Sequence, residues 1–360
     1  MAVSSALVHE SAFSFPVPIP YDKPYLPISA QIELLRERGM GVAADQVEAE
    51  AWLCRVGYYR LSGYWYPFRE RRNSLSDSGV QTIEVLESFR PGTEFSHAFN
   101  LYVFDKRLRL LILDAIEHLE VGLRVDIALL MGQSDPWAHR NPNNFNRYFR
   151  CVDPADLAVR HTKWISYLDA QAARSREEFA KHFFEKYKDP FPLWISIETW
   201  DFGTLSTLVN GMKDKDLQHL ADKYQIPRRT MLVSWIQSLN LVRNICAHHG
   251  RLWNRPMVIQ PAPPRGNEIP LFQHWSGNTY AKTRLYAVAA IIQYFLRTIS
   301  PMSTWGNRLK ETIAAFPGGP GLNLPPGGFP QDWIDEPLWR SEPKHPTSRE
   351  MATEQIAPSS

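Results

Sequence analysis

The sequence predicts an all-α protein: a helical bundle with additional helices on its N-terminal side and a Pro/Gly-rich C-terminal extension. Apolar residues recur every three or four positions through long stretches, most clearly in 93–131 and 228–249, which is the spacing of a buried helix face. Strand-like alternation is nearly absent, no internal repeat is visible, and Gly, Pro and Asn clusters separate the helical stretches. These observations favour helices packed on helices.

Composition sets the broad class of the protein. The chain has 360 residues, 44% of them hydrophobic, which is enough for one large domain or two modest ones. The net charge of +2 gives no global signal for a polyanionic partner, so any such surface must be local. The three cysteines, Cys54, Cys151 and Cys246, fit neither a disulfide framework nor a zinc site. We therefore expect a reducing compartment and no metal or other cofactor.

Two stretches bear on localisation. Residues 1–20 lack the basic start and apolar core of a signal peptide, and 285–296, the longest apolar run, is shorter than the roughly 20 residues that span a bilayer. We therefore expect a cytoplasmic protein without a membrane partner.

The N-terminal part begins with a flexible tail, 1–20, that ends in three prolines. A first helix is expected over 28–38, stopped by Gly39. Asp45 and Glu48 stand at the spacing of a capping box, which would open a second helix running to about residue 56.

An aromatic segment and a polar segment follow. Residues 57–69 combine many aromatics with two glycines, and we interpret them as a structural wedge packed under a loop. Residues 71–92 are polar and Ser-rich, which favours a loop or a short hairpin.

The stretch 93–131 predicts one long helix, continuous or with one break, that ends at Gly132. Charged residues interleave with its apolar face, and for most of them we expect a solvated face with paired charges. They are Asp105, Arg107, Arg109, Asp114, Glu117, Glu120 and Arg124. Glu120 and Arg124 form an i,i+4 pair that can orient an arginine across the bundle.

The middle of the chain reads as short helices. A loop over 135–145 contains a lone His139 with a packing role, and helices are expected over 155–173, 176–188 and 192–209, the last with a possible break near Gly203. Glu198 and Asp201, three apart on one helix, are expected to bind an arginine, either Arg243 or Arg251.

The C-terminal half adds helices over 214–225, 228–249 and 278–299, with Pro-rich loops up to about residue 275. From Phe316 onwards the composition shifts to Pro and Gly, so the tail is expected to be extended and partly disordered, with 329–333 and 337–339 docked on the core. The predicted organisation is therefore a tail 1–20, an N-terminal segment 21–92, a helical core 93–315 and a C-terminal tail 316–360.

Several side chains that could act in catalysis lie close together at the end of the 228–249 helix. Arg243, Asn244, His248 and His249 fall within seven residues, and Gly250 follows as a helix stop. A polar stripe at helical spacing runs through Gln237, Asn240, Asn244 and His248. Arginine offers a planar fork of donors to phosphate oxygens, and histidine exchanges protons near neutral pH. No acidic metal ligand stands beside them, so metal-free RNA cleavage is the chemistry that this set favours.

The ordinary alternative is a surface arginine and a helix-terminal histidine, because cations near a helix C-terminus are stabilised by the helix dipole. On the motif alone this alternative is the more common one.

The sequence around the motif favours RNA cleavage over this alternative. The strings YYRLSGYWYPF (58–68), LEVGLR (119–124), ETWDFGTLS (198–206) and RNICAHHGRLWNR (243–255) together resemble the Abi-like proteins of the abortive-infection AbiD/AbiF group.

The resemblance extends from about residue 21 to 339 and implies a HEPN-type helical bundle. HEPN ribonucleases carry Arg-x(4–6)-His, which implies a catalytic set of Arg243, Asn244 and His248. Supporting or RNA-binding residues would be His249, Arg251, Arg255, Glu120 and Arg124. The resemblance also implies a homodimer in which two motifs meet, and a small-RNA or protein antitoxin.

The expected function is therefore a metal-independent RNA endonuclease of bacterial anti-phage defence that cleaves by attack of the RNA 2′-hydroxyl. The alternative is a non-catalytic RNA-binding or scaffolding HEPN module, in which Arg243 and His248 hold a phosphate without cleaving. A third possibility is a helical protein-interaction domain without an RNA partner.

Overall fold

The protein is mostly helical and is built around one long helix. The computed structural model describes residues 20–75, 81–155, 157–275, 278–322 and 327–340. Helix α4 (Phe95–Gly132) is continuous over 38 residues and packs against α3, α8, α11, α13 and α14, whose bounds follow below. The predicted all-α class is confirmed, and so is the predicted long helix, in its unbroken form.

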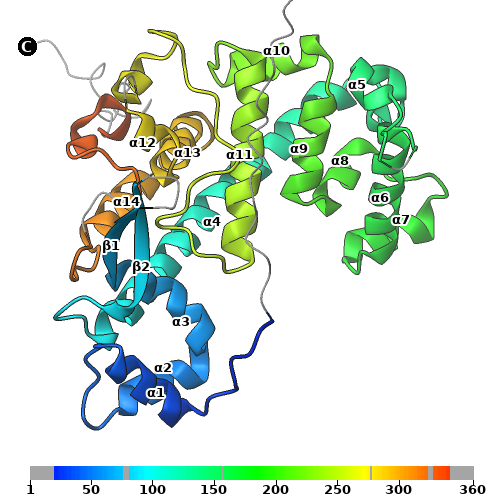
Figure 1. Cartoon of the computed structure of the whole chain (residues 1–360). Coiled ribbons are helices and arrows are strands. Elements are labelled where there is room, and N and C mark those ends of the chain that lie inside the picture. The colour runs from blue at the N-terminus through cyan, green and yellow to red at the C-terminus, as the bar shows by residue number, and fades with distance from the viewer. Residues whose placement is uncertain (1–19, 76–80, 156, 276–277, 323–326, 341–360) are drawn as a thin grey trace, which may run out of the picture.

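The N-terminal helices lie at one end of α4 (Figure 1). They are α1 (Ile28–Glu37), α2 (Val47–Val56) and α3 (Tyr58–Trp65), and a short 3-10 turn, η1 (Tyr66–Phe68), follows. The predicted capping box is wrong: Gln46 precedes α2 with a left-handed φ of 45°, and no side chain caps the helix. The aromatic segment is likewise a helix rather than a wedge under a loop, since Leu61, Tyr64 and Trp65 form its buried face.

The polar segment forms the hairpin that was one of its two predicted forms. Strand β1 (Arg69–Leu75) pairs with β2 (Gln81–Phe89) in antiparallel fashion, with Arg71 opposite Val85 and a register shift between Arg69 and Arg71. Only Phe89, near the bundle, is buried in β2. The rest of the β2 strand is exposed or half-buried, so the hairpin does not form a sheet core.

A second group of short helices lies on the other side of α11 (Figure 1). Its elements are η2 (Ala138–Arg140), η3 (Pro142–Asn144), α5 (Arg147–Arg150), α6 (Arg160–Arg174), α7 (Glu178–Lys186), α8 (Leu193–Ser196), η4 (Ile197–Thr199) and α9 (Phe202–Gly211). The predicted helix 192–209 breaks at Trp200 and Asp201, before Gly203, because the Asp201 carboxylate accepts the Thr204 backbone N–H at 2.7 Å and starts α9. His139 is fully buried, as expected for a packing role.

The C-terminal half completes the bundle. It contains α10 (Asp214–Lys223), α11 (Arg229–Ala247), η5 (Pro270–Trp275), α12 (Thr279–Lys282), α13 (Leu285–Ile299), α14 (Trp305–Ala314), η6 (Trp333–Asp335) and η7 (Pro337–Trp339). The predicted single helix 278–299 is wrong, since it is interrupted between α12 and α13. The Gly327 carbonyl accepts the Tyr286 N–H at 3.0 Å, so a distant segment docks where the helix would continue.

The closing segment is docked as predicted: Phe329, Trp333, Leu338 and Trp339 are all buried. Trp339 donates its indole N–H to the Tyr286 hydroxyl at 3.1 Å. One apolar core runs from Ile32 to Trp339, beside a small separate cluster of Ala180, Phe183 and Phe191. The predicted flexible tail 1–20, apart from its last residue, and the predicted disorder over 341–360 lie outside the described residues.

Candidate functional site

Helix α11 ends at Ala247, directly before the two histidines. The Gly250 N–H donates to the Ile245 carbonyl at 2.8 Å, and the His249 N–H donates to the Cys246 carbonyl at 3.1 Å, which together form a Schellman motif. The predicted end of the helix is wrong in two respects. The helix stops at Ala247, so that His248 is the C-cap, and His249, not Gly250, takes the left-handed φ of 58°. Both histidine side chains are exposed.

A glycine still suits position 250, where a side chain would be crowded. A Cβ there would lie 3.2 Å from the Ile245 carbonyl oxygen. The absence of a side chain therefore lets the chain close tightly over the helix end.

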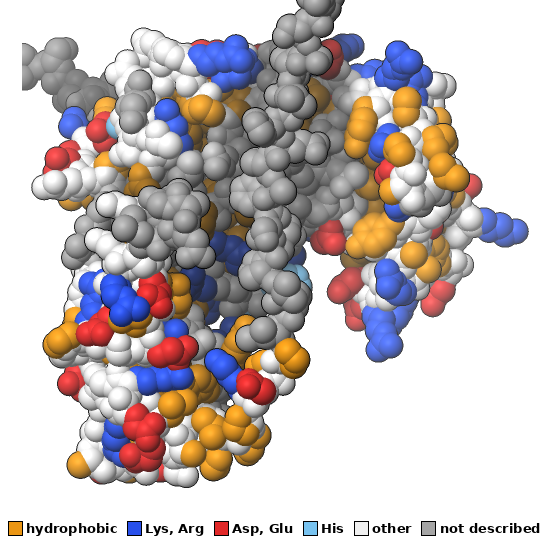
Figure 2. Space-filling view, viewed as in Figure 1, with side chains coloured by type: hydrophobic (Ala, Val, Ile, Leu, Met, Phe, Trp, Pro, Cys, Tyr) orange, Lys and Arg blue, Asp and Glu red, His pale blue; other side chains and the backbone are white. Residues whose placement is uncertain are grey.

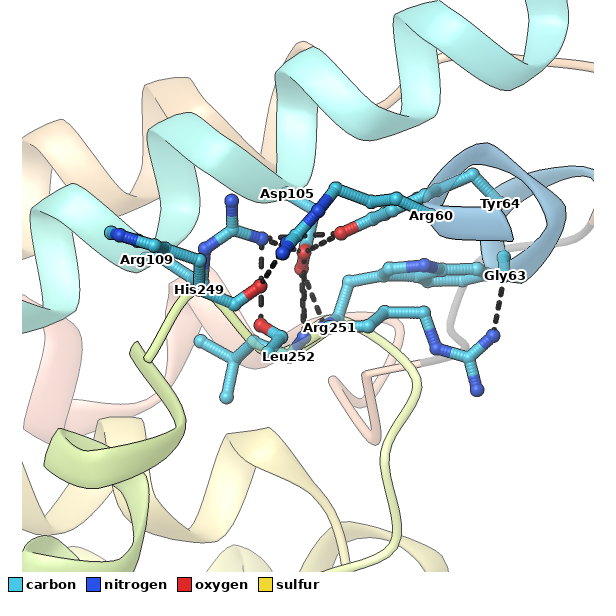
Figure 3. Close-up of polar contacts among 10 residues, drawn as sticks. Arg60, Gly63, Tyr64, Asp105, Arg109, His249, Arg251 and Leu252 are labelled. Atoms are coloured by element: carbon cyan, nitrogen blue, oxygen red, sulfur yellow. Dashed lines mark hydrogen bonds and ion pairs between the residues drawn. The ribbon is translucent and has the colours of Figure 1, made fainter. Parts of the chain in front are cut away.

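A buried network fixes the loop after the histidines (Figure 3). Asp105 of α4 accepts the backbone N–H of Leu252 at 3.1 Å and that of Trp253 at 2.8 Å, as well as the Tyr64 hydroxyl at 2.8 Å. Arg109 pairs with the same carboxylate and donates to the Tyr64 hydroxyl at 3.2 Å. This network ties α3, α4 and the loop after α11 into one unit.

The prediction that charges on the long helix are solvated is wrong for Asp105 and Arg109. Their side chains are 0% and 5% exposed. Burial raises the pKa of Asp105, whereas Arg109, Tyr64 and the two backbone amides act to lower it. The two residues are four apart on a helix, a spacing equally typical of solvated pairs, so the sequence contained no signal that separates the two cases.

Two further contacts join the N-terminal helices to the histidine loop. Arg60 donates to the His249 carbonyl oxygen at 2.8 Å, and Arg251 donates to the Gly63 carbonyl oxygen at 2.5 Å. The cleft between α3 and this loop is lined by Tyr59, Arg60, Gly63, Tyr64, His248, His249, Gly250, Arg251 and Arg255. Among the described residues, no carboxylate lines it, so its charge is positive.

A second hollow adjoins this cleft and shares Arg60 and His249 with it. Arg55 of α2 and Lys106 of α4 also line it, and its described lining again contains no acidic residue. In Figure 2, Lys and Arg side chains gather in the recess between the N-terminal helices and the rest of the molecule. We refer to Arg55, Arg60, Lys106, Arg251 and Arg255 as the basic tract.

Arg243 lies apart from His248, against α4. It lines a hollow with Leu110, Leu113, Asp114, Ile116, Glu117 and Glu120, and its guanidinium donates to the Asn244 carboxamide oxygen at 3.4 Å. Within one copy of the chain, therefore, Arg243 and Asn244 lie together, and His248 opens into the neighbouring cleft with His249, Arg251 and Arg255.

Glu120 lines the same hollow as Arg243, near enough to be affected by its charge. It also pairs with Arg124 at 2.5 Å, and Arg124 donates to the Trp200 carbonyl oxygen at 2.5 Å. Burial raises the pKa of Glu120, while Arg124 and Arg243 act to lower it. The predicted geometry of Glu198 and Asp201 is wrong: they do not share a helix, because Asp201 starts α9. Asp201 accepts the Tyr167 hydroxyl at 3.3 Å, and Arg251 binds Gly63 instead.

Sequence reasoning missed part of this site. Asp105, Arg109 and Lys106 come together with the histidine loop through the fold alone. Tyr59 lies beside Arg60 in the aromatic segment 57–69, whose unusual composition was the available signal. In the part of the chain that the structure describes, no three His, Cys, Asp or Glu side chains are grouped so as to hold a metal ion. No helix within the described ranges has the length and apolarity needed to cross a bilayer.

The fold and the site thus define an all-α protein with a basic, histidine-bearing cleft at the end of a central helix. The family model for Abi-like protein matches residues 51–254, which is more than half of the chain. The chain belongs to the Abi-like protein family, and the match covers α3, α4, α11 and the histidine loop. Comparison with curated proteins and with solved structures finds no significant match.

Proposed function

We propose that this protein is a metal-independent RNA endonuclease of the HEPN superfamily and the effector of a bacterial abortive-infection defence against phage, acting in the cytoplasm. The observation that carries the proposal is the pair of exposed histidines, His248 and His249, held beside the basic tract in a cleft whose described lining has no carboxylate. Such a cleft attracts a phosphodiester and supplies a proton carrier. Membership of the Abi-like family supports the defence role.

The reaction is an internal transesterification. The RNA 2′-hydroxyl oxygen attacks the adjacent phosphorus and loses its proton to a base, while the bond from phosphorus to the 5′ oxygen breaks and that oxygen gains a proton. The products carry a 2′,3′-cyclic phosphate and a 5′-hydroxyl. His248 acts as general acid or base, Arg243 stabilises charge on the phosphate oxygens, and Asn244 positions His248 or the phosphate.

Homodimerisation completes the site in this proposal. Arg243 lines the Glu120 hollow and His248 lines the neighbouring cleft, so within one copy the two side chains line different hollows. A two-fold axis near the end of α11 would set the Arg243 of one copy beside the His248 of another. A small-RNA or protein antitoxin would restrain the enzyme in an uninfected cell.

The alternative is a non-catalytic RNA-binding or scaffolding HEPN module, which the same basic tract would serve. A helical protein-interaction domain is a third possibility, for which the basic cleft would need an acidic protein partner. The first two functions are separated by whether RNA is cut, and the third by whether RNA binds.

The test uses purified protein in EDTA with end-labelled single-stranded RNA. The wild type is expected to cut, whereas His248→Ala and Arg243→Ala are expected to lose at least about 100-fold in rate, in line with removal of a proton carrier or a charge-stabilising donor. Matched controls are His219→Ala on α10 and Arg176→Ala before α7, both exposed and outside the clefts. Equal cleavage by all five proteins would reject the assignment of the site. Binding without cleavage would favour the scaffolding module.

A further inference from the structure

An exposed aromatic ring lies in the cleft between α3 and the loop of His248 and His249, which we call the histidine cleft. Tyr59 of α3 is 92% exposed and lines this cleft with both histidines. Its neighbour Tyr58 is packed instead, with its ring edge-on to that of Trp65 and the centroids 4.9 Å apart. A single exposed tyrosine is ordinary on a protein surface. Tyr59 is distinguished by its place, because it lines the cleft in which the proposed reaction occurs.

Helix α3 leaves room beside this ring. Gly63 follows Tyr59 by four residues, so the two lie one turn apart on the same face of the helix, and both line the histidine cleft. Beyond its own helix backbone and its two chain neighbours, a Cβ at Gly63 would meet no atom within 4 Å. The glycine therefore leaves open space next to the tyrosine. The whole cleft has a volume of ≈ 590 Å³, which is in the range of small-ligand sites.

Two hydrogen bonds fix this strip of α3 against the histidine loop. Arg60, next to Tyr59, donates to the His249 carbonyl oxygen at 2.8 Å, and Arg251 donates to the Gly63 carbonyl oxygen at 2.5 Å (Figure 3). Both ends of the strip are thus joined to the loop that carries the histidines. A ligand held on the ring is therefore placed in the histidine cleft by the fold itself.

The charge of the cleft indicates what kind of ligand the ring meets. Arg60, Arg251 and Arg255 line it, and none of its described lining residues is a carboxylate. A basic groove that holds phosphates, with an aromatic ring on which a base stacks, is the usual arrangement for binding single strands. In a duplex the bases are already stacked on one another and paired, so an unpaired base is the one with a face free for Tyr59.

We propose that Tyr59 is the stacking platform for one unpaired base of the bound RNA, and that the histidine cleft thereby selects single-stranded RNA. The base occupies the space that Gly63 leaves open, and the basic tract holds the neighbouring phosphates. The inference rests on the proposed function for the identity of the ligand, and it adds the substrate class and a residue that binds it. Because every base has a face that stacks, we expect little dependence on which base it is.

The test measures affinity and uses full-length His248→Ala protein, in which the RNA stays intact. Three labelled ligands are compared: single-stranded oligo(U), an abasic ribose-phosphate strand of the same length, and an RNA duplex. We expect Tyr59→Ala to weaken oligo(U) binding about 10-fold, in line with the loss of one stacked base, and to leave the other two unchanged. The slope of log affinity against log salt should also stay the same, because no phosphate contact is lost.

Three further variants separate stacking from folding. Tyr59→Phe keeps the ring and should bind oligo(U) like the parent. Gly63→Leu fills the space beside the ring and should weaken oligo(U) binding, although leucine forms helices better than glycine, so a loss of helix is not the cause. Tyr25→Ala is the matched control and should change nothing, since Tyr25 is 88% exposed before α1 and outside the cleft lining.

The outcomes separate this inference from the proposed catalysis. Oligo(U) binding that survives Tyr59→Ala, or an equal loss for the abasic strand, would overturn the stacking role even if the wild type cuts RNA. Unchanged binding in Gly63→Leu would contradict the place given to the base. A loss confined to oligo(U) would support the stacking role even if the wild type cuts nothing. Absence of any RNA binding would overturn both proposals.

Discussion

Arg60, near the start of α3, donates a hydrogen bond of 2.8 Å to the backbone carbonyl of His249, 189 positions later in the chain. This contact joins the aromatic N-terminal segment to the loop that carries the two histidines. Together with the Asp105 network it makes the position of His248 depend on α3 and α4 as much as on α11. Helix α11 alone therefore does not determine the site.

Replacing Asp105 should destabilise both the fold and the site. Asp105→Ala leaves Arg109 buried without its carboxylate and removes the acceptor for the Leu252 and Trp253 amides. We expect a loss of about 3–5 kcal/mol in the free energy of unfolding, measured by urea denaturation, with faster hydrogen exchange at 250–254. Asp114→Ala is the control: its pair with Arg308 is exposed on both sides, so the loss should stay below about 1 kcal/mol. Equal losses would contradict the role of the network.

Replacing His249 should affect cleavage much less than replacing His248. His249 holds a left-handed φ, so His249→Gly relieves strain and should raise stability by up to about 1 kcal/mol, while its backbone carbonyl still meets Arg60. Cleavage should remain within a few-fold of the wild type. Thermal unfolding and the RNA cleavage assay check the two halves of this prediction. A cleavage rate as low as that of His248→Ala would move the proton-transfer role to His249.

The basic tract predicts a salt dependence of RNA binding. In the His248→Ala background, Arg55→Ala and Lys106→Ala should each weaken binding to every RNA sequence alike and reduce the slope of log affinity against log salt by about 1. The reason is that RNA binding releases fewer counterions when one phosphate contact is lost. Lys181→Ala on α7 serves as the control, since it is exposed and lies outside the tract. An unchanged slope in both tract variants would place the RNA elsewhere.

His139 predicts a loss of stability in acid. Burial lowers its pKa from 6.5 to about 4, and both of its ring nitrogens lack partners among the described residues. The folded state therefore binds fewer protons than the unfolded state between these values, so this contribution to stability is full above pH 6.5, falls as the pH drops from 6.5 and is lost below about 4. Urea denaturation at pH 7, 5.5 and 4.5 measures this loss. His139→Phe should make the profile shallower but not flat, because burial also lowers the pKa of His274 to about 4. An equally steep profile in that variant would assign the acid sensitivity to other groups.

Sequence patterns predicted the elements whose stability is local. The long helix α4 and the motif helix α11 follow from apolar spacing alone, because their buried faces extend over many turns. Errors occur where a distant segment decides the outcome. The break between α12 and α13 depends on the docking of Gly327 and Gly328, and the burial of Asp105 and Arg109 depends on a loop nearly 150 residues away.

In the candidate site, too, the residues that are close in sequence were predicted, and those that the fold brings in were not. Arg243, Asn244, His248 and His249 were found from the sequence because they are neighbours in it. The partners that shape their surroundings were missed or undervalued, since Lys106 looks like any helix-surface lysine and Arg60 like part of an aromatic segment. Only the packing of α3 against α4 brings them to the histidine loop. The polar stripe of α11 was visible, but the cleft that Gln237 and Asn240 line is formed only with α6 and α9 beside it.

The measurement that tests the central claim most directly uses an RNA with one mapped cut site, and the same RNA with a 2′-deoxynucleotide immediately 5′ of the scissile phosphate. Internal transesterification predicts that wild-type protein in EDTA cuts the first RNA, leaving a 2′,3′-cyclic phosphate and a 5′-hydroxyl, and leaves that site in the second RNA intact. Cleavage of the deoxy-substituted site at the same rate, or products with a 5′-phosphate, would show that water attacks the phosphorus and would contradict the role proposed for Arg243 and His248.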